Sequence, residues 1–461
     1  MALKPYNESY ITSIANVLRT KVGTTSTFTI KEMAPAINQY NNYYLKDYLE
    51  GNLYTLNLPE LTRASINAAF RGCENLSYVN LPNVSMNLGD NYFAYCYNLK
   101  EIQIPNVVSI GSSTFYNCYN LSSITVPKIG SIGSYAFYNC SNLSRFEPFE
   151  SLATSSTTIS LYSSAFAYTG LTKLNLSKMI TLSLKGYGIF AYCSQLSSVS
   201  TSAYASTIPS YTFMYCSNLN YVSIPNATGV YNYAFESCYR LTTVNVQSRD
   251  LIGNAAFLDC RILSSINLPL VSIIQAQRFS NCFSLRSISL PICEKINTWV
   301  FNSCSSLTEI SLPSCTLIDQ YAFYKCINLS KIYAPSVSSV GTMAFAYCYS
   351  LSSVTFNSLT NLFGQAFTNC SNLSYVDLGN YTSTIYASTF SGNYNLLNLY
   401  LRGGTVCSLS NINAFRRTPI SNNTTSTGGV YGSIHVPASL LTTYQTATNW
   451  ATYSSRFVGD L

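Results

Sequence analysis

The chain has 461 residues, of which 47% are apolar, 39 are tyrosine and only 9% are charged, against roughly 25% charged in a typical soluble domain. This balance excludes intrinsic disorder, which goes with high charge and few aromatic side chains. The net charge of +7 is spread without a basic block, and the longest apolar run is Met343–Tyr349, so neither a nucleic-acid surface nor a membrane span of about 20 apolar residues is indicated.

The first 45 residues predict a small helical segment. Helical spacing relates Ile11, Ile14, Ala15 and Leu18. Thr29 and Glu32 form a plausible capping box for a second short helix. No apolar stretch typical of a signal peptide occurs here. The pattern I-A-x-x-L-R-x-K-x-G-T-T, followed by T-x-x-E-M-A-x-A-I, resembles a short segment of tail-associated proteins of bacteriophages and prophages. The resemblance implies that residues 1–45 attach the chain to a virion.

A single motif then recurs along residues 46–437. It is close to Ala-Phe-x-x-Cys-x-x-Leu-x-x-Ile-x-Leu-Pro, as in AFRGCENLSYVNLP and VFNSCSSLTEISLP. A single unit cannot bury its own apolar edge, so the repeat predicts a solenoid of stacked units that share one core. Sixteen copies, separated mostly by 22 residues, are marked by Phe70, Phe93, Phe115, Phe137, Phe166, Phe190, Phe213, Phe235, Phe257, Phe279, Phe301, Phe323, Phe345, Phe367, Phe390 and Phe415.

One unit predicts its own local structure. Leu307, Ile310 and Leu312 indicate a short strand with one buried face. A proline such as Pro313 often follows and ends the parallel ladder, because it has no N–H to donate. An aliphatic residue such as Ile318 then recurs five positions before the next phenylalanine. We expect the Ala-Phe segment to form roughly one short helical turn that returns the chain to the next strand.

Thirteen of the sixteen cysteines lie three residues after the repeat phenylalanine. No CxxC pair occurs, and no two cysteines are closer than the 11 positions that separate Cys282 from Cys293. We therefore predict a ladder of buried thiols in which cysteine acts as a small hydrophobe, rather than disulfides or a metal site. Such a ladder fits synthesis in a reducing compartment.

Two breaks in the period predict surface loops that either carry binding or serve as flexible filler. One is at residues 151–160, and the other is the Ser/Thr/Gly-rich segment at residues 416–432. After Pro437, residues 438–461 predict an amphipathic helix that caps the open end of the core. Its apolar side chains are Leu440, Leu441, Tyr444 and Trp450.

Residues 117–140, NCYNLSSITVPKIGSIGSYAFYNC, carry nearly all of the unit L-x-x-I-x-L-P followed by I-G-x-x-A-F-x-x-C. This unit resembles the BspA-like branch of the leucine-rich-repeat superfamily, over about residues 50–437, and the last unit resembles the terminal unit of many such arrays. The resemblance implies a right-handed solenoid with a parallel β-sheet on one face and a surface role in adhesion or recognition, with no catalytic residues. Many bacterial members also carry an export signal and an anchoring module, which this chain does not show.

The outward strand positions form the candidate binding surface. Most hold Ser, Thr or Asn, as expected where equivalent residues stack about 4.8 Å apart and like charges would repel. Tyrosine suits an interface, because it has an apolar face and a polar tip, but it is also ordinary in strands. The candidate ligand-binding residues are Tyr78, Tyr221, Tyr333, Tyr375 and Tyr400.

Catalysis is not indicated. The single histidine, His435, lies in the last repeat strand without a motif around it, so neither a catalytic triad nor a histidine-ligated metal is supported. Glu147 and Glu150 are the acids closest to each other in the repeat array, but no motif around them indicates a catalytic pair of carboxylates. We expect a non-enzymatic protein without a cofactor or metal.

The sequence favours a phage tail or fibre protein, located in the virion. Residues 1–45 would bind other tail proteins, and the solenoid would bind a host-surface glycan or protein. The lack of an export signal and the reduced cysteines favour this interpretation, because virions assemble in the cytoplasm. The alternatives are a bacterial or protist cell-surface adhesin and a purely structural virion component. No nucleic-acid partner is expected, and association into a homo-oligomer is left open.

Overall fold

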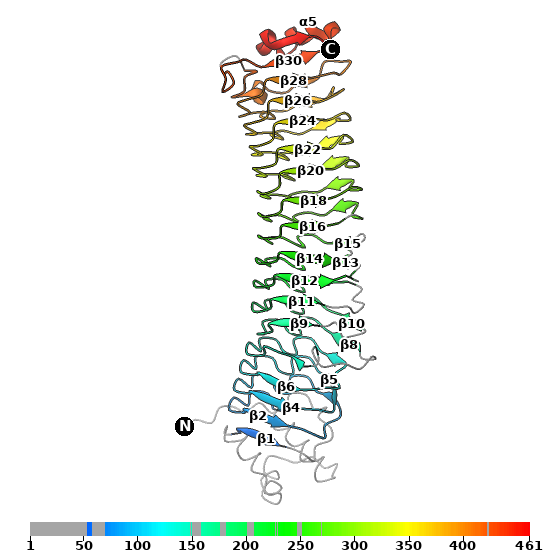
Figure 1. Cartoon of the computed structure of the whole chain (residues 1–461), viewed down its shortest axis with the longest axis vertical. Coiled ribbons are helices and arrows are strands. Elements are labelled where there is room, and N and C mark those ends of the chain that lie inside the picture. Colours follow the sequence, from blue (N-terminus) through cyan, green and yellow to red (C-terminus); the bar gives the residue numbers. More distant parts are fainter. Residues whose placement is uncertain are drawn as a thin grey trace, which may run out of the picture. The chain divides into compact units, whose positions relative to one another are not determined.

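The computed structural model describes residues 53–57, 70–147, 149, 158–175, 181–200, 207–225, 227, 229–246, 251–268, 270–421 and 424–461. The predicted attachment segment, residues 1–45, and most of the predicted loop at 151–160 lie outside these residues. The chain divides into two compact units, residues 1–226 and residues 227–461. Each unit is a stack of similar coils (Figure 1).

The strands that follow the repeat leucine, here called front strands, are parallel within each unit. In Figure 1 those of the second unit follow one another in chain order from β14 to β30. The first unit contains β1 (Thr55–Asn57), β2 (Tyr78–Asn80), β4 (Glu101–Gln103), β6 (Ser123–Thr125), β9 (Lys173–Asn175), β11 (Ser198–Ser200) and β12 (Tyr221–Ile224). The second unit contains β14 (Thr243–Val246), β16 (Ser265–Asn267), β18 (Ser287–Ser289), β20 (Glu309–Ser311), β22 (Lys331–Tyr333), β24 (Ser353–Thr355), β26 (Tyr375–Asp377), β28 (Asn398–Tyr400) and β30 (Ser433–Val436). The strand β31 (Phe457–Gly459), from the C-terminal cap, pairs with β30 and extends this column.

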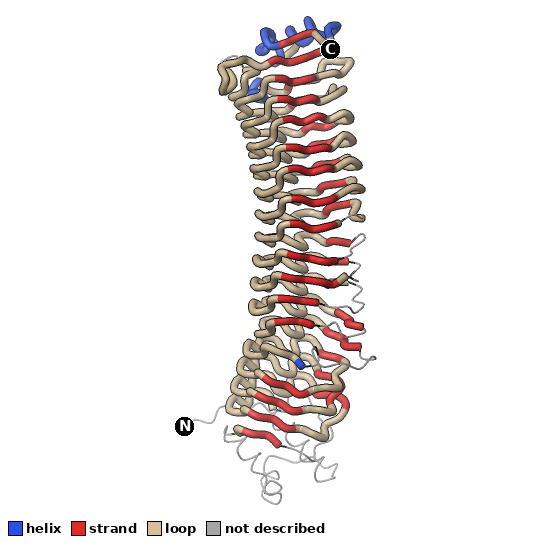
Figure 2. Tube along the Cα trace, in the orientation of Figure 1, coloured by secondary structure: helices blue, strands red, loops and turns tan. Residues whose placement is uncertain are grey.

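A second column of short parallel strands, here called side strands, lies before the repeat phenylalanines (Figure 2). We expected a sheet on one face only, but the aliphatic residue five positions before each phenylalanine sits in this second ladder. The first unit contains β3 (Met86–Leu88), β5 (Val107–Ile110), β7 (Ser131–Ile132), β8 (Thr158–Leu161) and β10 (Thr181–Leu184). The second unit contains β13 (Gly229–Val230), β15 (Leu251–Ile252), β17 (Ile273–Ile274), β19 (Lys295–Ile296), β21 (Leu317–Ile318), β23 (Ser339–Val340), β25 (Asn361–Leu362), β27 (Thr384–Ile385) and β29 (Ser408–Leu409).

The repeat phenylalanines form a continuous stack inside each unit. In the second unit, Phe301, Phe323 and Phe345 are fully buried, and both neighbouring pairs of ring centroids are 5.2 Å apart. In the front strands, the middle residue is buried between two outward residues, as in β18 and β20. The predicted parallel β-solenoid of about sixteen turns is thereby confirmed.

The segment around each phenylalanine is not the short helical turn that we expected. In one turn of the second unit, Trp299 and Ser303 have φ angles of 61° and 59°, which a right-handed helix does not contain. These left-handed residues aim backbone N–H groups at the next turn. Trp299, Phe301 and Ser303 donate to backbone carbonyls one repeat later, at 3.1, 2.8 and 2.7 Å. The turns therefore form a third ladder of hydrogen bonds between repeats.

The cysteine ladder has polar contacts as well as apolar ones. The Cys304 Sγ lies 3.1 Å from the Phe279 carbonyl oxygen of the preceding repeat, and Cys326 repeats this contact with Phe301 at 3.0 Å. The same carbonyl of Phe301 also accepts the Cys304 backbone N–H. The thiol therefore uses the second lone pair of an oxygen that is already bonded within its own turn, which a purely hydrophobic residue would leave unused.

All sixteen cysteines are free, and fifteen of them are buried. Burial raises the pKa of Cys193 to about 11 and that of Cys370 to about 12, from an ordinary value of 9.0. We expect these fifteen thiols to resist alkylation by iodoacetamide at pH 8 in the folded protein and to react fully in urea, because the thiolate is the nucleophile.

The same shifts predict the pH dependence of stability. The folded pKa values lie above the unfolded one, so this stabilisation is complete below pH 9 and is lost as pH rises through 11 to 12. The melting temperature should therefore fall above pH 9. Fast native labelling of the buried thiols, or a melting temperature constant from pH 8 to 11, would contradict this account.

Residues 438–461 fold over the last repeat. They contain the 3-10 turns η2 (Ala438–Leu440) and η3 (Trp450–Arg456), the helix α5 (Leu441–Thr446) and β31, which pairs with β30. A further 3-10 turn, η1 (Ile412–Phe415), carries the last repeat phenylalanine. Trp450 is 1% exposed and donates its Nε1–H to the Cys407 carbonyl at 2.7 Å. Its ring centroid lies 5.9 Å from that of Phe415.

Candidate binding surface

The five predicted tyrosines are divided between the two units. Tyr78 starts β2 and Tyr221 starts β12, in the first unit. In the second unit, Tyr333 ends β22, Tyr375 starts β26 and Tyr400 ends β28. The structure brings Tyr375 and Tyr400 together, with ring centroids 5.0 Å apart. The five therefore do not form one aromatic cluster.

A groove with a volume of about 720 Å³ crosses the front strands β18, β20, β22 and β24. It lies where the described front strands belong to separate ladders, since β16 pairs with β18, β20 with β22, and β24 with β26. Ile288, Ile310 and Ile332 form its floor. Ile288 is 8% exposed, whereas Val376 in β26 is completely buried. Ile332 is the exception among these middle residues, because it is partly exposed, so the groove uncovers the apolar layer mainly at β22.

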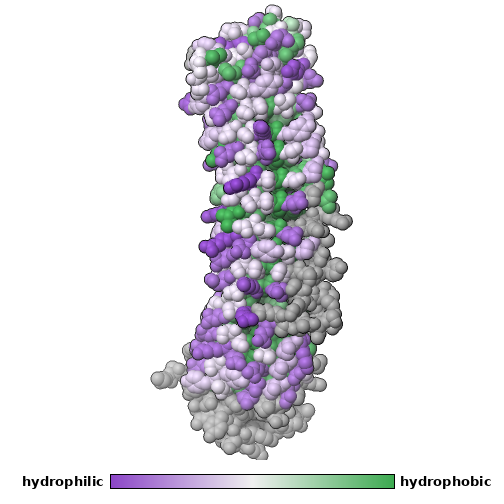
Figure 3. Space-filling view, in the orientation of Figure 1, coloured by the Kyte–Doolittle hydropathy of each residue, from purple (hydrophilic) through white to green (hydrophobic). Residues whose placement is uncertain are grey.

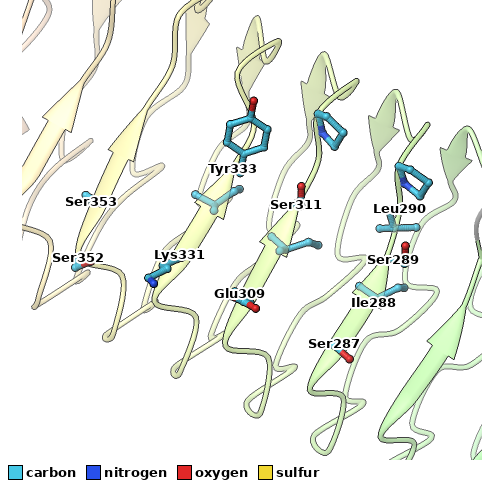
Figure 4. Close-up of a pocket in the computed structure, with 14 residues that line it drawn as sticks. Ser287, Ile288, Ser289, Leu290, Glu309, Ser311, Lys331, Tyr333, Ser352 and Ser353 are labelled. Atoms are coloured by element: carbon cyan, nitrogen blue, oxygen red, sulfur yellow. The ribbon is translucent and has the colours of Figure 1, made fainter.

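The rim of this groove is polar. The first residues of three of the strands, Ser287, Glu309 and Lys331, lie toward one end, and the third residues, Ser311 and Tyr333, lie toward the other (Figure 4). Glu309 and Lys331 are direct register partners. In the view of Figure 3, the second unit shows mostly pale side chains of weak hydropathy, broken by a few strongly hydrophilic and hydrophobic ones. The neighbouring front strands β16, β18 and β24 present only serine, threonine and asparagine outward, so this charged pair is an exception there.

Tyr333 stands at this rim and is 59% exposed. Its register partner is Ser311, and Thr355 takes the equivalent position in β24. Both neighbours are small, so the ring is not stacked between aromatic side chains of adjacent strands. A groove with an exposed aromatic ring at one end and a carboxylate and an ammonium group at the other can stack on a ligand and donate and accept hydrogen bonds.

Tyr375 and Tyr400 have a different environment. Asp377 is only 7% exposed and accepts from the Arg402 Nε at 2.9 Å and from the Gly379 backbone N–H at 2.9 Å. The Tyr375 hydroxyl donates to the same carboxylate at 3.4 Å. Burial and the negative charge of Asp377 raise the pKa of Tyr375. The two rings are thus anchored by an ion pair on the front face.

The only histidine of the chain completes this cluster. The His435 ring stacks on Tyr400 with centroids 4.2 Å apart, and the Arg402 guanidinium lies 5.0 Å from the Tyr400 ring centre. His435 Nδ1 is 2.9 Å from a carboxylate oxygen of Asp460, and Nε2 is 3.2 Å from the Asn398 amide oxygen. The ring of Tyr400 is therefore already covered by protein groups, so Tyr333 is the better placed of the two to stack on a ligand.

Sequence reasoning missed the groove and the role of Arg402. The sequence motif does not reveal that the front strands belong to separate ladders, because β18, β20, β22 and β24 have the ordinary repeat residues. Arg402 could have been noticed in the sequence, because it replaces the proline that follows the strand in most repeats.

The predicted loop at residues 416–432 is held against the second unit over most of its described length. The Thr427 hydroxyl donates to the Asn395 amide oxygen at 2.7 Å. The Arg456 guanidinium lies 3.7 Å from the centre of the Tyr431 ring. This loop therefore has specific contacts with the array and with the cap, unlike flexible filler.

No group of metal-ligating side chains is found among the described residues. The helices in that same part of the chain are too short or too polar to cross a membrane.

The stacked parallel coils, the buried leucine and phenylalanine columns and the polar front strands define a leucine-rich-repeat protein. Residues 44–154, 145–263, 228–351 and 316–428 match the family described as BspA type Leucine rich repeat region (6 copies), and the chain belongs to this family.

The fold is shared with a solved structure. A leucine-rich repeat protein from Bacteroides ovatus is 24% identical, with 76% of this chain and 87% of that chain covered and a TM-score of 0.58. A leucine rich cell surface protein from Faecalibacterium prausnitzii is 19% identical, with 78% and 88% covered and a TM-score of 0.32. No curated protein matches the sequence significantly.

Proposed function

We propose that this protein is a non-enzymatic adhesin that acts at a cell surface and binds a glycan or a protein through the front strands of its second unit. The observation that carries the proposal is the groove over β18 to β24, with exposed Tyr333 at one end and Glu309 and Lys331 at the other. Family membership supports it, because the BspA type repeat is a scaffold of surface recognition proteins.

The phage-tail interpretation has less support. Neither the family match nor the similar structures point to a virion protein, and residues 1–45, on which that interpretation depends, lie outside the described residues. Mass spectrometry of washed cell envelopes and of purified phage particles from the same culture separates the two. We expect the protein in the envelopes. A fixed stoichiometric amount in the particles would instead establish a virion component.

The binding surface is tested by replacing Tyr333 with alanine. We expect binding to arrays of glycans and extracellular-matrix proteins to weaken at least about tenfold, since a central aromatic ring typically contributes more than about 1.4 kcal/mol to an interface. The matched control is Tyr187→Ala, because Tyr187 is 64% exposed but lies in the first unit. Equal binding by both variants would remove the groove from the proposal without affecting the cell-surface assignment.

A further inference from the structure

The ladder of front strands in the second unit is interrupted twice inside the groove. Among the described strands, β20 pairs with β22 and β24 pairs with β26, but β18 is not paired with β20 and β22 is not paired with β24. The front strands β18, β20, β22 and β24 all line the groove. We call the two interruptions, β18/β20 and β22/β24, the front gaps. No strand pairing has to break when a front gap changes its width.

The paired strands show which bonds a front gap lacks. Leu312 follows β20 and donates its backbone N–H to the Tyr333 carbonyl of β22 at 2.7 Å. Ser330 precedes β22 and donates its backbone N–H at 2.8 Å to the carbonyl of Thr308, which precedes β20. One such bond therefore fastens each end of a paired front strand to the neighbouring repeat.

These fastening bonds are missing at the front gaps. Within residues 270–421, all of which the structure describes, the backbone N–H groups of Leu290 and Thr308 donate no hydrogen bond across the gap β18/β20. At the gap β22/β24, the Ala334 N–H donates none, and the bond from Ser352 lengthens to 3.5 Å. Leu290 and Ala334 are only 1% and 3% exposed. Two buried residues therefore have a backbone donor without an acceptor, which costs free energy.

The other two ladders continue across both gaps. The side strands β19 and β21 pair across the first gap, and β23 and β25 pair across the second. In the turns, Phe279 donates its N–H to the Val300 carbonyl at 3.0 Å, and Phe323 donates to the Ala344 carbonyl at 2.7 Å. Each coil is thus fastened to the next on two sides and free on the third, so it can rotate about the fastened sides without losing a hydrogen bond.

A front gap therefore has two arrangements. When the gap β18/β20 closes, Leu290 can donate to Ser311 as Leu312 donates to Tyr333, and the outward side chains cover the isoleucine floor. When the gap is open, as in this structure, the floor is accessible and the unpaired N–H groups need oxygen acceptors from another molecule. A ligand that binds only the open arrangement shifts the population toward it.

We propose that the groove is a clamp whose front gaps open and close about the side strands and the turns, and that a ligand holds it open by giving oxygen acceptors to the unpaired N–H groups. This inference rests on the proposed role of the groove in binding and adds how the groove adapts to its ligand. The ligand needs hydroxyl, carbonyl or carboxylate oxygens beside an apolar part that lies on the floor.

The first test is hydrogen exchange of the full chain without ligand. Leu290 and Leu312 form a matched pair, because both follow a front strand, precede a proline and are almost completely buried. We expect the Leu290 amide to exchange severalfold faster than the Leu312 amide, since only the latter is hydrogen-bonded. Equal protection of the two amides would overturn the open gap and, with it, the clamp.

The second test fastens one front gap with a short tether. Ser289 and Ser311 are the last residues of β18 and β20 (Figure 4), and equivalent residues of paired strands lie about 4.8 Å apart. Ser289→Cys and Ser311→Cys are joined by a methylene bis-methanethiosulfonate. Each thiol forms a disulfide with this reagent and releases methanesulfinate and a proton, and dithiothreitol removes the tether. The matched control joins Ser200→Cys and Ser223→Cys, which are register partners in the paired strands β11 and β12.

The probe of the open groove is anilinonaphthalene sulfonate, which has apolar rings for the isoleucine floor and sulfonate oxygens as acceptors. We expect the tether between β18 and β20 to weaken its binding at least about tenfold, because the rings lose their floor. Dithiothreitol should restore binding, and the control tether should leave it unchanged. Unchanged binding to the tethered groove, or an equal loss in the control, would overturn the clamp. Neither test uses the glycan and protein arrays, so a failure of Tyr333→Ala to weaken array binding is seen separately.

Discussion

Replacing Phe323 with alanine is expected to lower the free energy of unfolding of the second unit by about 3 to 5 kcal/mol. Phe323 is completely buried between Phe301 and Phe345, with 5.2 Å between ring centroids on both sides. Removing the ring leaves a cavity inside the stack, which the ladders of the turns and strands prevent from closing. Urea unfolding followed by circular dichroism measures the loss.

The damage should also be local. Each repeat of a solenoid contacts only its neighbours, so hydrogen exchange is expected to accelerate in the repeats of Phe301 and Phe345 before it does so in distant ones. Tyr349→Ala provides the control, because Tyr349 is 45% exposed. A loss below about 1 kcal/mol, or a uniform rise in exchange over the whole unit, would contradict the role given to the phenylalanine stack.

The second large effect is expected at the C-terminal cap. Trp450→Ala should cost about 3 to 5 kcal/mol, because Trp450 fills the space between Phe415, Tyr444 and Phe457. It also leaves the buried Cys407 carbonyl without its 2.7 Å donor. We expect α5 and β31 to exchange their amide protons faster than any strand before β28.

The chain contains one other tryptophan, which makes a matched comparison. Trp299 is partly exposed and stacks on Tyr321 with centroids 4.0 Å apart. Trp299→Ala should therefore destabilise the second unit clearly less than Trp450→Ala. If the two substitutions cost the same, or if the cap kept its protection without Trp450, the last repeat would not depend on this side chain.

The period of the sequence predicts the fold because three columns of apolar residues must stack at the same spacing. Leu307, Ile310 and Phe301 mark that spacing directly. The side strands were not foreseen, since a buried aliphatic such as Ile318 is equally compatible with a loop that packs on the core. The conformation of the turns was also missed. Residues such as Trp299 carry no sign of a left-handed backbone, which is imposed by the hydrogen bonds to the next turn.

The candidate site was predicted only in outline. Alternation placed Tyr333 on the outer face of its strand, and the structure agrees. The groove beside it arises where neighbouring strands leave a common ladder, a relation between repeats that no single repeat encodes. The cluster around Tyr400 likewise depends on Asp377, Arg402 and His435, which come from successive repeats and meet only after the coils stack.

The left-handed turns have a consequence for how such a protein diversifies. Single left-handed residues other than glycine cost roughly 1 to 2 kcal/mol, yet these positions hold Trp299, Ser303, Lys325, Gln277 and Met343 alike. The backbone path is therefore fixed by ladder bonds between repeats and not by the identity of the side chain. Each turn can change its exposed residue while the frame stays constant, so one repeat can acquire a new chemical surface without any of its neighbours having to adapt.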